Sequence, residues 1–220
     1  MGTRPIESDV LSLFPTFVWK VRWAPDLVAR VDATVRATAT LANGAWRELP
    51  PGSGWQSAPD LHRLPAMREF VACVRDAAKP VLRFLCVAEH SLDVTGCWIN
   101  VNARGSAHRV HVHPNNYLSG VYYVHTAPGA DTVNFHDPRP QTSVLRAPVT
   151  ALTAENADQV VVHVEDGMLL LFPAYLPHSV TASESDRLRI SVSFNLMFED
   201  SAERWSAANW SGGDSRRGRS

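Results

Sequence analysis

The second half of the chain is a series of short apolar segments, and this series limits the fold more than any other feature. Eight segments with alternating or continuous apolar residues follow Leu92, each bounded by turn residues. Such segments predict β-strands. They cover about residues 94–103, 108–113, 117–125, 132–136, 159–164, 168–172, 178–183 and 188–198. Because no helical pattern lies between them, we expect a β-sandwich or barrel rather than a parallel α/β sheet.

The first part of the chain carries helical patterns instead. Pro25 and Asp26 start a run of apolar residues at helical spacing, and Gly44 lies beyond its end. A second helix is expected over Pro65–Val87, where Pro80 should break or kink it. The fold class is therefore mostly β with N-terminal helices.

The remaining segments complete the expected organisation. Residues 11–19 predict an opening strand interrupted by proline, and residues 49–58 predict a loop rich in Pro, Gly and Ser. We expect one domain over residues 1–208, with a helical part over about 1–92, a β core over about 93–199, and a disordered tail at 209–220.

Composition excludes several classes of function. The net charge of −1 over 220 residues provides no field that would attract nucleic acid or an anionic membrane. No apolar stretch approaches the 18 residues or so of a membrane span, and the N-terminus lacks the apolar stretch of a secretory signal. We therefore expect a cytoplasmic protein that acts on a small molecule, and a homodimer remains open.

Three histidines predict a metal site. His111 and His113 are two residues apart in an expected strand, so their side chains point to the same side, about 6–7 Å apart along the backbone. His178 begins another expected strand. Unpaired imidazoles are costly to bury in an apolar barrel, and non-haem iron(II) is held by two histidines and usually a carboxylate. The trio therefore predicts an iron site.

Arg189 and Ser191 predict an anion-binding site beside the metal. They are also two residues apart on one expected strand, and a guanidinium with a nearby hydroxyl binds a carboxylate well. The alternative is that Arg189 forms a surface ion pair with Asp186 or Glu199. Arg187 is two residues from Arg189 and would lie on the same face of the strand, so it is a second candidate for binding the anion.

Taken together, these residues resemble the 2-oxoglutarate and iron(II)-dependent oxygenases, in particular a bacterial branch with an H-x-H, a distal histidine and an R-x-S. The likeness covers residues 94–198 well and the N-terminal third only loosely. It rests on the segments Trp98–Asn102, His111–Pro114, Ser119–Val124, Phe135–Arg139, Phe172-Pro173 and Arg189–Asn195.

The resemblance implies a double-stranded β-helix, a jelly-roll fold shared with the cupins. It also implies that His111 and His178 bind iron(II). His113 stands where a carboxylate normally completes the set of ligands, so the third ligand is either His113 or a carboxylate such as Asp137.

The resemblance further implies that 2-oxoglutarate is the cosubstrate, with its distal carboxylate bound by Arg189 and Ser191. Asn100 and Asn102 share a face with Trp98 and are candidates for further hydrogen bonds to the cosubstrate.

The implied reaction consumes O₂ and 2-oxoglutarate, releases succinate and CO₂, and oxidises an unactivated C–H bond, with hydroxylation as the default outcome. An amino acid or a biosynthetic intermediate is the expected class of substrate. No catalytic residue is expected beyond the metal ligands. The residues expected on the substrate side are Asp137, Arg139, Tyr123 and Trp55.

Two other functions fit parts of the same pattern. Gly167, Pro173 and His178 match the spacing of a cupin motif, which would make the protein a three-histidine metal dioxygenase or isomerase that does not use 2-oxoglutarate. The glutamate expected soon after a cupin H-x-H is missing, because Asn115–Leu118 occupy that stretch. A metal-free β-barrel that binds a small ligand is the non-enzymatic alternative.

Overall fold

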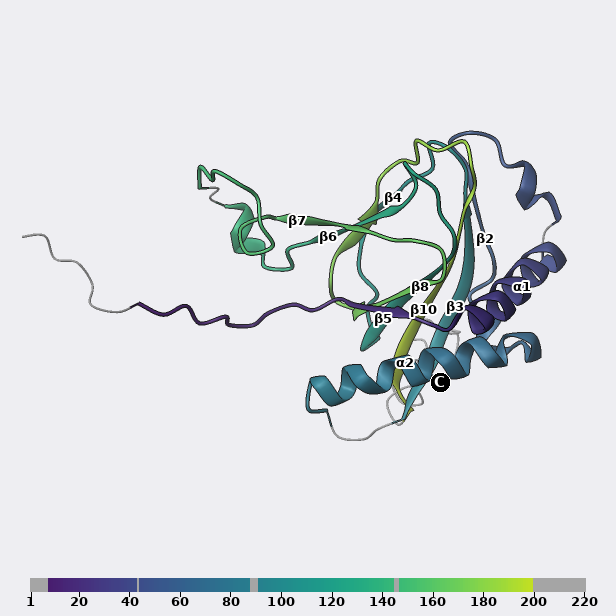
Figure 1. Cartoon of the computed structure of the whole chain (residues 1–220), viewed down its shortest axis with the longest axis horizontal. Coiled ribbons are helices and arrows are strands. Elements are labelled where there is room, and N and C mark those ends of the chain that lie inside the picture. Colours follow the sequence, from purple (N-terminus) through teal and green to yellow (C-terminus); the bar gives the residue numbers. More distant parts are fainter. Residues whose placement is uncertain (1–7, 43, 88–90, 145–146, 200–220) are drawn as a thin grey trace, which may run out of the picture.

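Two antiparallel β-sheets and two α-helices make up most of the described part of the chain (Figure 1). The structure is a computed structural model that describes residues 8–42, 44–87, 91–144 and 147–199. Its helices are α1 (Pro25–Ala42) and α2 (Arg68–Phe84), with short 3₁₀ helices at Gly44–Glu48, Leu61–Arg63, Pro65–Met67 and Pro140–Ser143. Its strands are β1 (Trp19–Arg22), β2 (Gly54–Gln56), β3 (Leu92–Asn102), β4 (His108–His111), β5 (Leu118–His125), β6 (Thr132–His136), β7 (Gln159–His163), β8 (Met168–Pro173), β9 (His178–Val180) and β10 (Arg189–Phe198).

The strand order identifies the fold. The larger sheet has the order β1-β8-β5-β10-β3-β2, and the smaller sheet has the order β4-β9-β6-β7. The strands from β3 to β10 thus divide equally between two facing sheets that are joined into a jelly roll. This is a double-stranded β-helix with N-terminal helices, and it confirms the predicted fold class.

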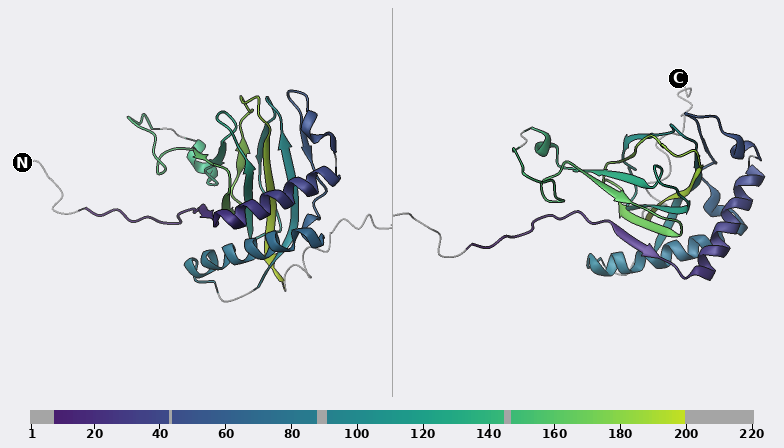
Figure 2. Two further views of the ribbon diagram at one scale, coloured as in Figure 1. Left: turned by 45° about the vertical axis from the view of Figure 1, so that its right-hand side comes forward. Right: turned by 45° about the horizontal axis from the view of Figure 1, so that its top comes forward.

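The larger sheet is buried on both faces, because helices cover one face and the smaller sheet covers the other (Figure 2). Strand β8 shows the consequence in its sequence. Leu169 and Leu171 pack toward the helices, whereas Leu170 and Phe172 pack into the barrel. Side chains alternate between the two faces of a strand, so a strand with two buried faces appears as a continuous apolar run.

Strands β3 and β10 carry most of their apolar residues on one face. Ile99 in β3 and Val192 in β10 face the helices with their alternate neighbours. The other face of each strand carries polar side chains that line a cavity inside the barrel. These are Asn100, Asn102, Arg189, Ser191 and Ser193. This alternation places the polar residues of two neighbouring strands on one floor.

Most of the predicted elements are present. All eight strands predicted after Leu92 are confirmed, and α1 begins at the predicted Pro25. Helix α2 runs through Pro80, so of the two predicted effects of this proline, a break or a kink, the break does not occur. Strand β2 was expected to be part of a loop; its three residues become a strand because they pair with β3. The tail at 209–220 lies outside the described residues.

The predicted opening strand at residues 11–19 is also wrong. Strand β1 begins only at Trp19, where it pairs with Leu171 of β8. Pro15 lacks the N–H that a sheet requires, and Phe14 has a φ of 55°, which lies outside the β region. Residues 8–18 therefore run past the edge of the sheet without joining it.

Candidate metal centre

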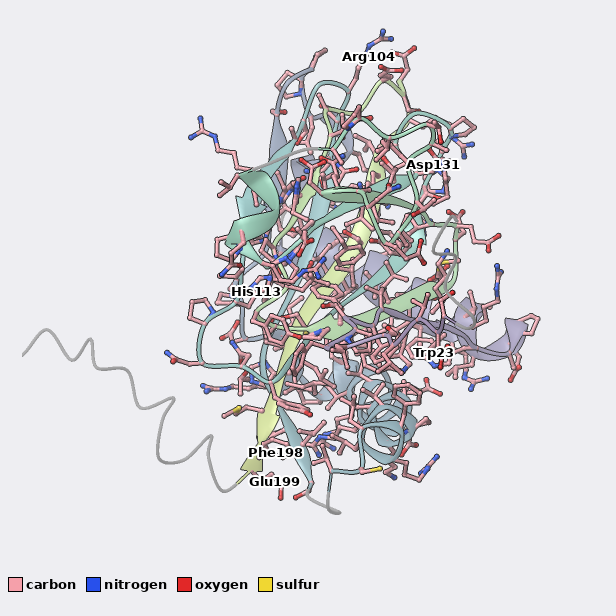
Figure 3. All side chains as sticks on the ribbon, turned by 90° about the vertical axis from the view of Figure 1, so that its left-hand side faces the viewer. Trp23, Arg104, His113, Asp131, Phe198 and Glu199 are labelled. Carbon is pink, nitrogen blue, oxygen red and sulfur yellow. The ribbon has the colours of Figure 1, made fainter. Side chains whose placement is uncertain are left out.

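Three histidine side chains converge at one end of the barrel. Strands β4 and β9 pair so that His111 and His178 stand directly opposite each other. His113 lies just beyond the end of β4, where its N–H donates to the Ala174 carbonyl at 3.0 Å. One ring nitrogen of each histidine lies within 4.8 Å of the others. Figure 3 labels His113 and views the body from the side toward which the loop between β6 and β7 projects.

Hydrogen bonds orient two of the three rings. The Nδ1 of His111 lies 2.7 Å from the Arg109 carbonyl, and the Nδ1 of His178 lies 2.9 Å from the Leu176 carbonyl. A carbonyl can only accept, so each Nδ1 carries the proton and each Nε2 keeps its lone pair. Holding a histidine by its other nitrogen is how proteins orient metal ligands.

Burial keeps the rings of His113 and His178 neutral. It lowers the pKa of His113 to about 4 and that of His178 to about 4, with a smaller contribution from the neighbouring histidines. The Nε2 atoms of His113 and His178 are 3.3 Å apart. Neutral imidazole nitrogens that face one common point suit a divalent transition metal such as iron(II). The residues present therefore fit an iron ion.

A polar floor extends from the histidines across the larger sheet. Ser191 of β10 stands beside Asn100 of β3 and Tyr123 of β5, and Gln56 of β2 stands beside Asn100 on its other side. These four residues line a cavity of about 270 Å³ together with the three histidines. Trp98 borders the same cavity, and its ring centroid lies 5.9 Å from that of His113.

Arg189 forms the far wall of this cavity. It is only 4% exposed, it donates to the Thr132 carbonyl at 3.1 Å, and its guanidinium lies 5.2 Å from the centroid of the Tyr123 ring. Among the described residues, no carboxylate forms an ion pair with it. A buried guanidinium without an anion is unfavourable, so this position is suited to an anionic ligand.

Neither of the two carboxylates considered as surface partners of Arg189 is paired with it. Asp186 pairs with Arg104 at 2.8 Å, and Glu199 hydrogen-bonds to Ser91. Arg187 precedes β10 and is exposed, so it does not compete for the cavity.

Two buried polar atoms in the cavity have no hydrogen-bond partner in the described part of the chain. They are the Oδ1 of Asn100 and the hydroxyl of Tyr123. A buried polar atom without a partner costs about 1–3 kcal/mol. Asn102, by contrast, is satisfied by Ser106 and His108 at 2.9 and 3.2 Å. Unpartnered polar atoms beside a lone guanidinium again point to a polar ligand.

Comparison with known proteins identifies the family. Residues 96–195 match the family described as "Putative 2OG-Fe(II) oxygenase". The matched segment contains the three histidines and the arginine wall. Residues 96–195 of this chain thus belong to the 2-oxoglutarate and iron(II)-dependent oxygenases. The cofactors of this oxygenase family are iron(II), 2-oxoglutarate and O₂, as the sequence predicted. The family favours the oxygenase prediction over the cupin-type enzyme and the metal-free barrel.

Solved structures share the fold of the oxygenase at low sequence identity. A prolyl-4-hydroxylase from Pseudomonas putida is 17% identical, with a TM-score of 0.56 over 83% of this chain and 93% of its own. The carbocyclase SnoK from nogalamycin biosynthesis is 16% identical, with a TM-score of 0.59 over 83% and 80%. HygX from Streptomyces hygroscopicus, with nickel and 2-oxoglutarate bound, is 13% identical, with a TM-score of 0.56 over 84% and 83%. No curated protein matches the chain in sequence.

Three residues predicted to lie on the substrate side of the oxygenase are placed elsewhere. Asp137 and Arg139 pair with each other at 2.7 Å and line a second cavity, not the one that contains the histidines. Asp137 is also outside the group of side chains that can share a metal, so the structure brings His113 and not Asp137 to that position. Trp55 packs on the core beneath the helices, because it faces away from the barrel on β2.

The remaining predicted residues lie together at one cavity, where Tyr123, expected on the substrate side, lies against Arg189. Several other residues that line the cavity were missed. The histidines, Asn100, Asn102, Tyr123, Arg189 and Ser191 all line one cavity. Gln56 was missed because its strand was predicted as a loop. The available signal was that Gln56 follows Trp55 directly and therefore points to the opposite face of a strand. Trp98 was noted only as a neighbour of Asn100 and also lines the cavity. None of the helices in the described part of the oxygenase has the length and apolar character that a membrane crossing requires.

Proposed function

We propose that the protein uses iron(II), 2-oxoglutarate and O₂ to oxidise an unactivated C–H bond of a small molecule, most simply by hydroxylation. In this proposal, His111, His113 and His178 hold the iron. Arg189 and Ser191 bind the distal carboxylate of 2-oxoglutarate. The observation that carries the proposal is the convergence of three imidazoles beside a buried guanidinium that has no carboxylate partner among the described residues.

His113 and His178 supply ligands that need no deprotonation near neutral pH. Burial lowers the pKa values of His113 and His178 to about 4, so both are ready to bind metal over the physiological range. The Leu176 carbonyl fixes the ring of His178 and leaves its Nε2 for the ion. When bound, the iron and 2-oxoglutarate supply an O₂-dependent oxidation that releases succinate and CO₂. The chain itself contributes position, charge and exclusion of water.

The far wall of the cavity selects the cosubstrate. A carboxylate placed at Arg189 would compensate a charge that is otherwise buried with only a carbonyl and an aromatic ring nearby. The hydroxyls of Ser191 and Tyr123 are donors on the same floor, and the Tyr123 hydroxyl is one of the two unpartnered atoms. If the Asn100 amide turns over, its Nδ2 faces the ligand while its Oδ1 accepts from Ser193.

The size of the cavity limits the substrate. A volume of about 270 Å³ is at the small end of ligand sites, which span about 300–1,000 Å³, so a bound diacid would fill much of it. The substrate would then approach along the open side, where His111 is exposed and where Gln56 and Trp98 border the cavity. An amino acid or a biosynthetic intermediate is of suitable size. The similar structures include a hydroxylase and a carbocyclase of a biosynthetic pathway, which supports oxidation of this class of substrate.

The test is formation of succinate from 2-oxoglutarate. Purified protein is supplied with iron(II), 2-oxoglutarate and O₂, without and then with a panel of amino acids, and succinate is measured. We expect succinate that depends on all three reagents and rises with an accepted substrate. The matched control is His178→Ala, which should reduce succinate to the level without protein. Equal succinate from both proteins, or none from either, would contradict the proposal.

A further inference from the structure

An extended N-terminal arm projects from the body without a place in either sheet. We call residues 10–18 the arm. It leaves β1 on the side where the loop between β6 and β7 also projects (Figures 1 and 2). The apolar side chains of its outer part are largely exposed: Val10 is 91%, Leu11 76%, Leu13 68% and Phe14 92% exposed. Four apolar side chains in five residues exposed to this degree mark a contact surface rather than scattered surface residues.

Phe14 is the most unusual residue of the arm. Its φ of 55° lies in the left-handed region, where a bulky aromatic residue is strained by about 1–3 kcal/mol. Such conformations persist where surrounding contacts impose them. Phe14 is nevertheless 92% exposed, so its own chain provides little to hold it. The strained backbone leaves the aromatic side chain of Phe14 exposed, as expected of a residue that anchors an interface.

A cavity suited to an aromatic side chain lies beside the arm. We call it the seam cavity, because it lies between the arm and the edge of the smaller sheet. Its volume is about 490 Å³, larger than that of the cavity at the histidines. Val160 and Val162 of β7, Leu176 and Phe135 provide apolar walls. The Asp137–Arg139 pair lines the same cavity.

We propose that two copies of the chain form a two-fold dimer in which Phe14 of each copy enters the seam cavity of the other. The anchor and the cavity lie side by side on one face of the same chain, because Phe14 also stands at the edge of its own seam cavity. A two-fold axis would bury the Phe14 side chain and the seam cavity of each copy together, since a two-fold interface buries the same patch on both copies. A net charge of −1 gives little repulsion between copies.

The apolar area is of the size that a stable dimer needs. The exposed apolar side chains of the arm and the cavity are Val10, Leu11, Leu13, Phe14 and Val160. Side chains of these types each offer roughly 60–120 Å² of apolar surface, so together they expose on the order of 400 Å² per copy. A standard interface buries about 800 Å² per partner, slightly more than half of it apolar.

Strand β7 provides a second reason for a partner. It is the edge of the smaller sheet, and among the described residues no strand pairs with its outer side. Val160 is 38% exposed and Val161 is 50% exposed, on opposite faces of this strand. An exposed apolar edge invites pairing with another chain unless it is covered. A second copy at this face would cover it.

The test is the mass of the protein in solution, measured by light scattering during size-exclusion chromatography over a range of concentrations. The chain has a mass of 24.3 kDa, so a dimer has twice that mass. The disrupting variants are Phe14→Glu in the arm and Val160→Glu at the cavity. Leu41→Glu is the matched control, because Leu41 is 90% exposed but lies at the end of α1, away from this face. Phe14→Leu keeps an apolar anchor.

We expect the unchanged protein, Leu41→Glu and Phe14→Leu to be dimers at micromolar concentrations. Phe14→Glu and Val160→Glu should each raise the dimer dissociation constant at least about a hundredfold, because each substitution occurs twice in the interface. Circular dichroism should show unchanged secondary structure in Phe14→Glu, which removes no buried contact. A monomeric unchanged protein overturns the proposal, and so does a dimer that both disrupting variants leave intact. Neither result depends on iron or 2-oxoglutarate.

Discussion

Replacing Arg189 by methionine should separate binding of the cosubstrate from folding. The side chain is 4% exposed, and its described interactions are one hydrogen bond to the Thr132 carbonyl and the contact with the Tyr123 ring. The hydrogen bond contributes about 1.5–3 kcal/mol to stability, and the contact of the guanidinium with the ring contributes up to about 2 kcal/mol. Burying the charge costs several kcal/mol, and methionine avoids that cost. The free energy of unfolding without 2-oxoglutarate should therefore change by no more than about 1–2 kcal/mol.

The affinity for 2-oxoglutarate should change far more. Removing one partner of a buried charged pair costs about 2–5 kcal/mol, which raises the dissociation constant by about 30-fold to about 5,000-fold. At a concentration of 100 times its dissociation constant, 2-oxoglutarate stabilises the unchanged protein by about 2.7 kcal/mol. In a chain of this length, that corresponds to a rise in Tm of about 5–10 °C. Arg189→Met should lose this rise.

The assay is thermal unfolding with and without 2-oxoglutarate, together with calorimetric titration, in protein loaded with a redox-inert divalent metal. Arg187→Met is the control, because Arg187 has the same strand parity but is exposed. It should bind 2-oxoglutarate as the unchanged protein does. If Arg189→Met keeps its affinity, the guanidinium does not bind the cosubstrate, and the assignment of the far wall fails.

Three further substitutions test the site and the sheet beneath it. His178→Ala should reduce bound iron(II), measured by metal analysis, from one per chain to a small fraction, while the circular dichroism spectrum stays unchanged. A full iron content in this variant would show that His178 is not a ligand. His113→Asp should keep iron and part of the succinate formation, because a carboxylate is the usual third ligand; loss of both would show that the site requires an imidazole there. Gly120→Ala should lower the free energy of unfolding by about 1–3 kcal/mol in denaturant titration. Its Cβ would lie 2.7 Å from the Leu170 carbonyl and against the Phe194 ring, and an unchanged stability would contradict this packing.

The alternation of side chains made much of this fold predictable from the sequence. Strand β8 shows a continuous run of leucines because helices and barrel bury both of its faces. Strand β10 places Arg189 and Ser191 on one face because they are two residues apart. The distant His178 was grouped with His111 because unpaired imidazoles are costly to bury, whereas the β4–β9 pairing that joins the two residues is not encoded locally.

The features that sequence could not predict depend on contacts with distant parts of the chain. Gly54–Gln56 becomes a strand only because β3 offers an edge, so Gln56 could not be assigned to the cavity. Arg187 and Arg189 have the same parity, and only the start of β10 at Arg189 decides between them. Asp137 was a candidate metal ligand in the sequence, but in the structure it forms an ion pair with Arg139 and lines the seam cavity instead of the cavity at the histidines.

The most direct test of the central claim is X-ray absorption spectroscopy of protein loaded with iron(II) under anaerobic conditions. The scattering pattern of coordinated imidazoles reports how many histidines bind the metal. We expect one iron per chain with three imidazole ligands, contributed by His111, His113 and His178. A protein that binds no iron, or an iron with fewer than two imidazoles, would contradict the convergence on which the proposed function depends.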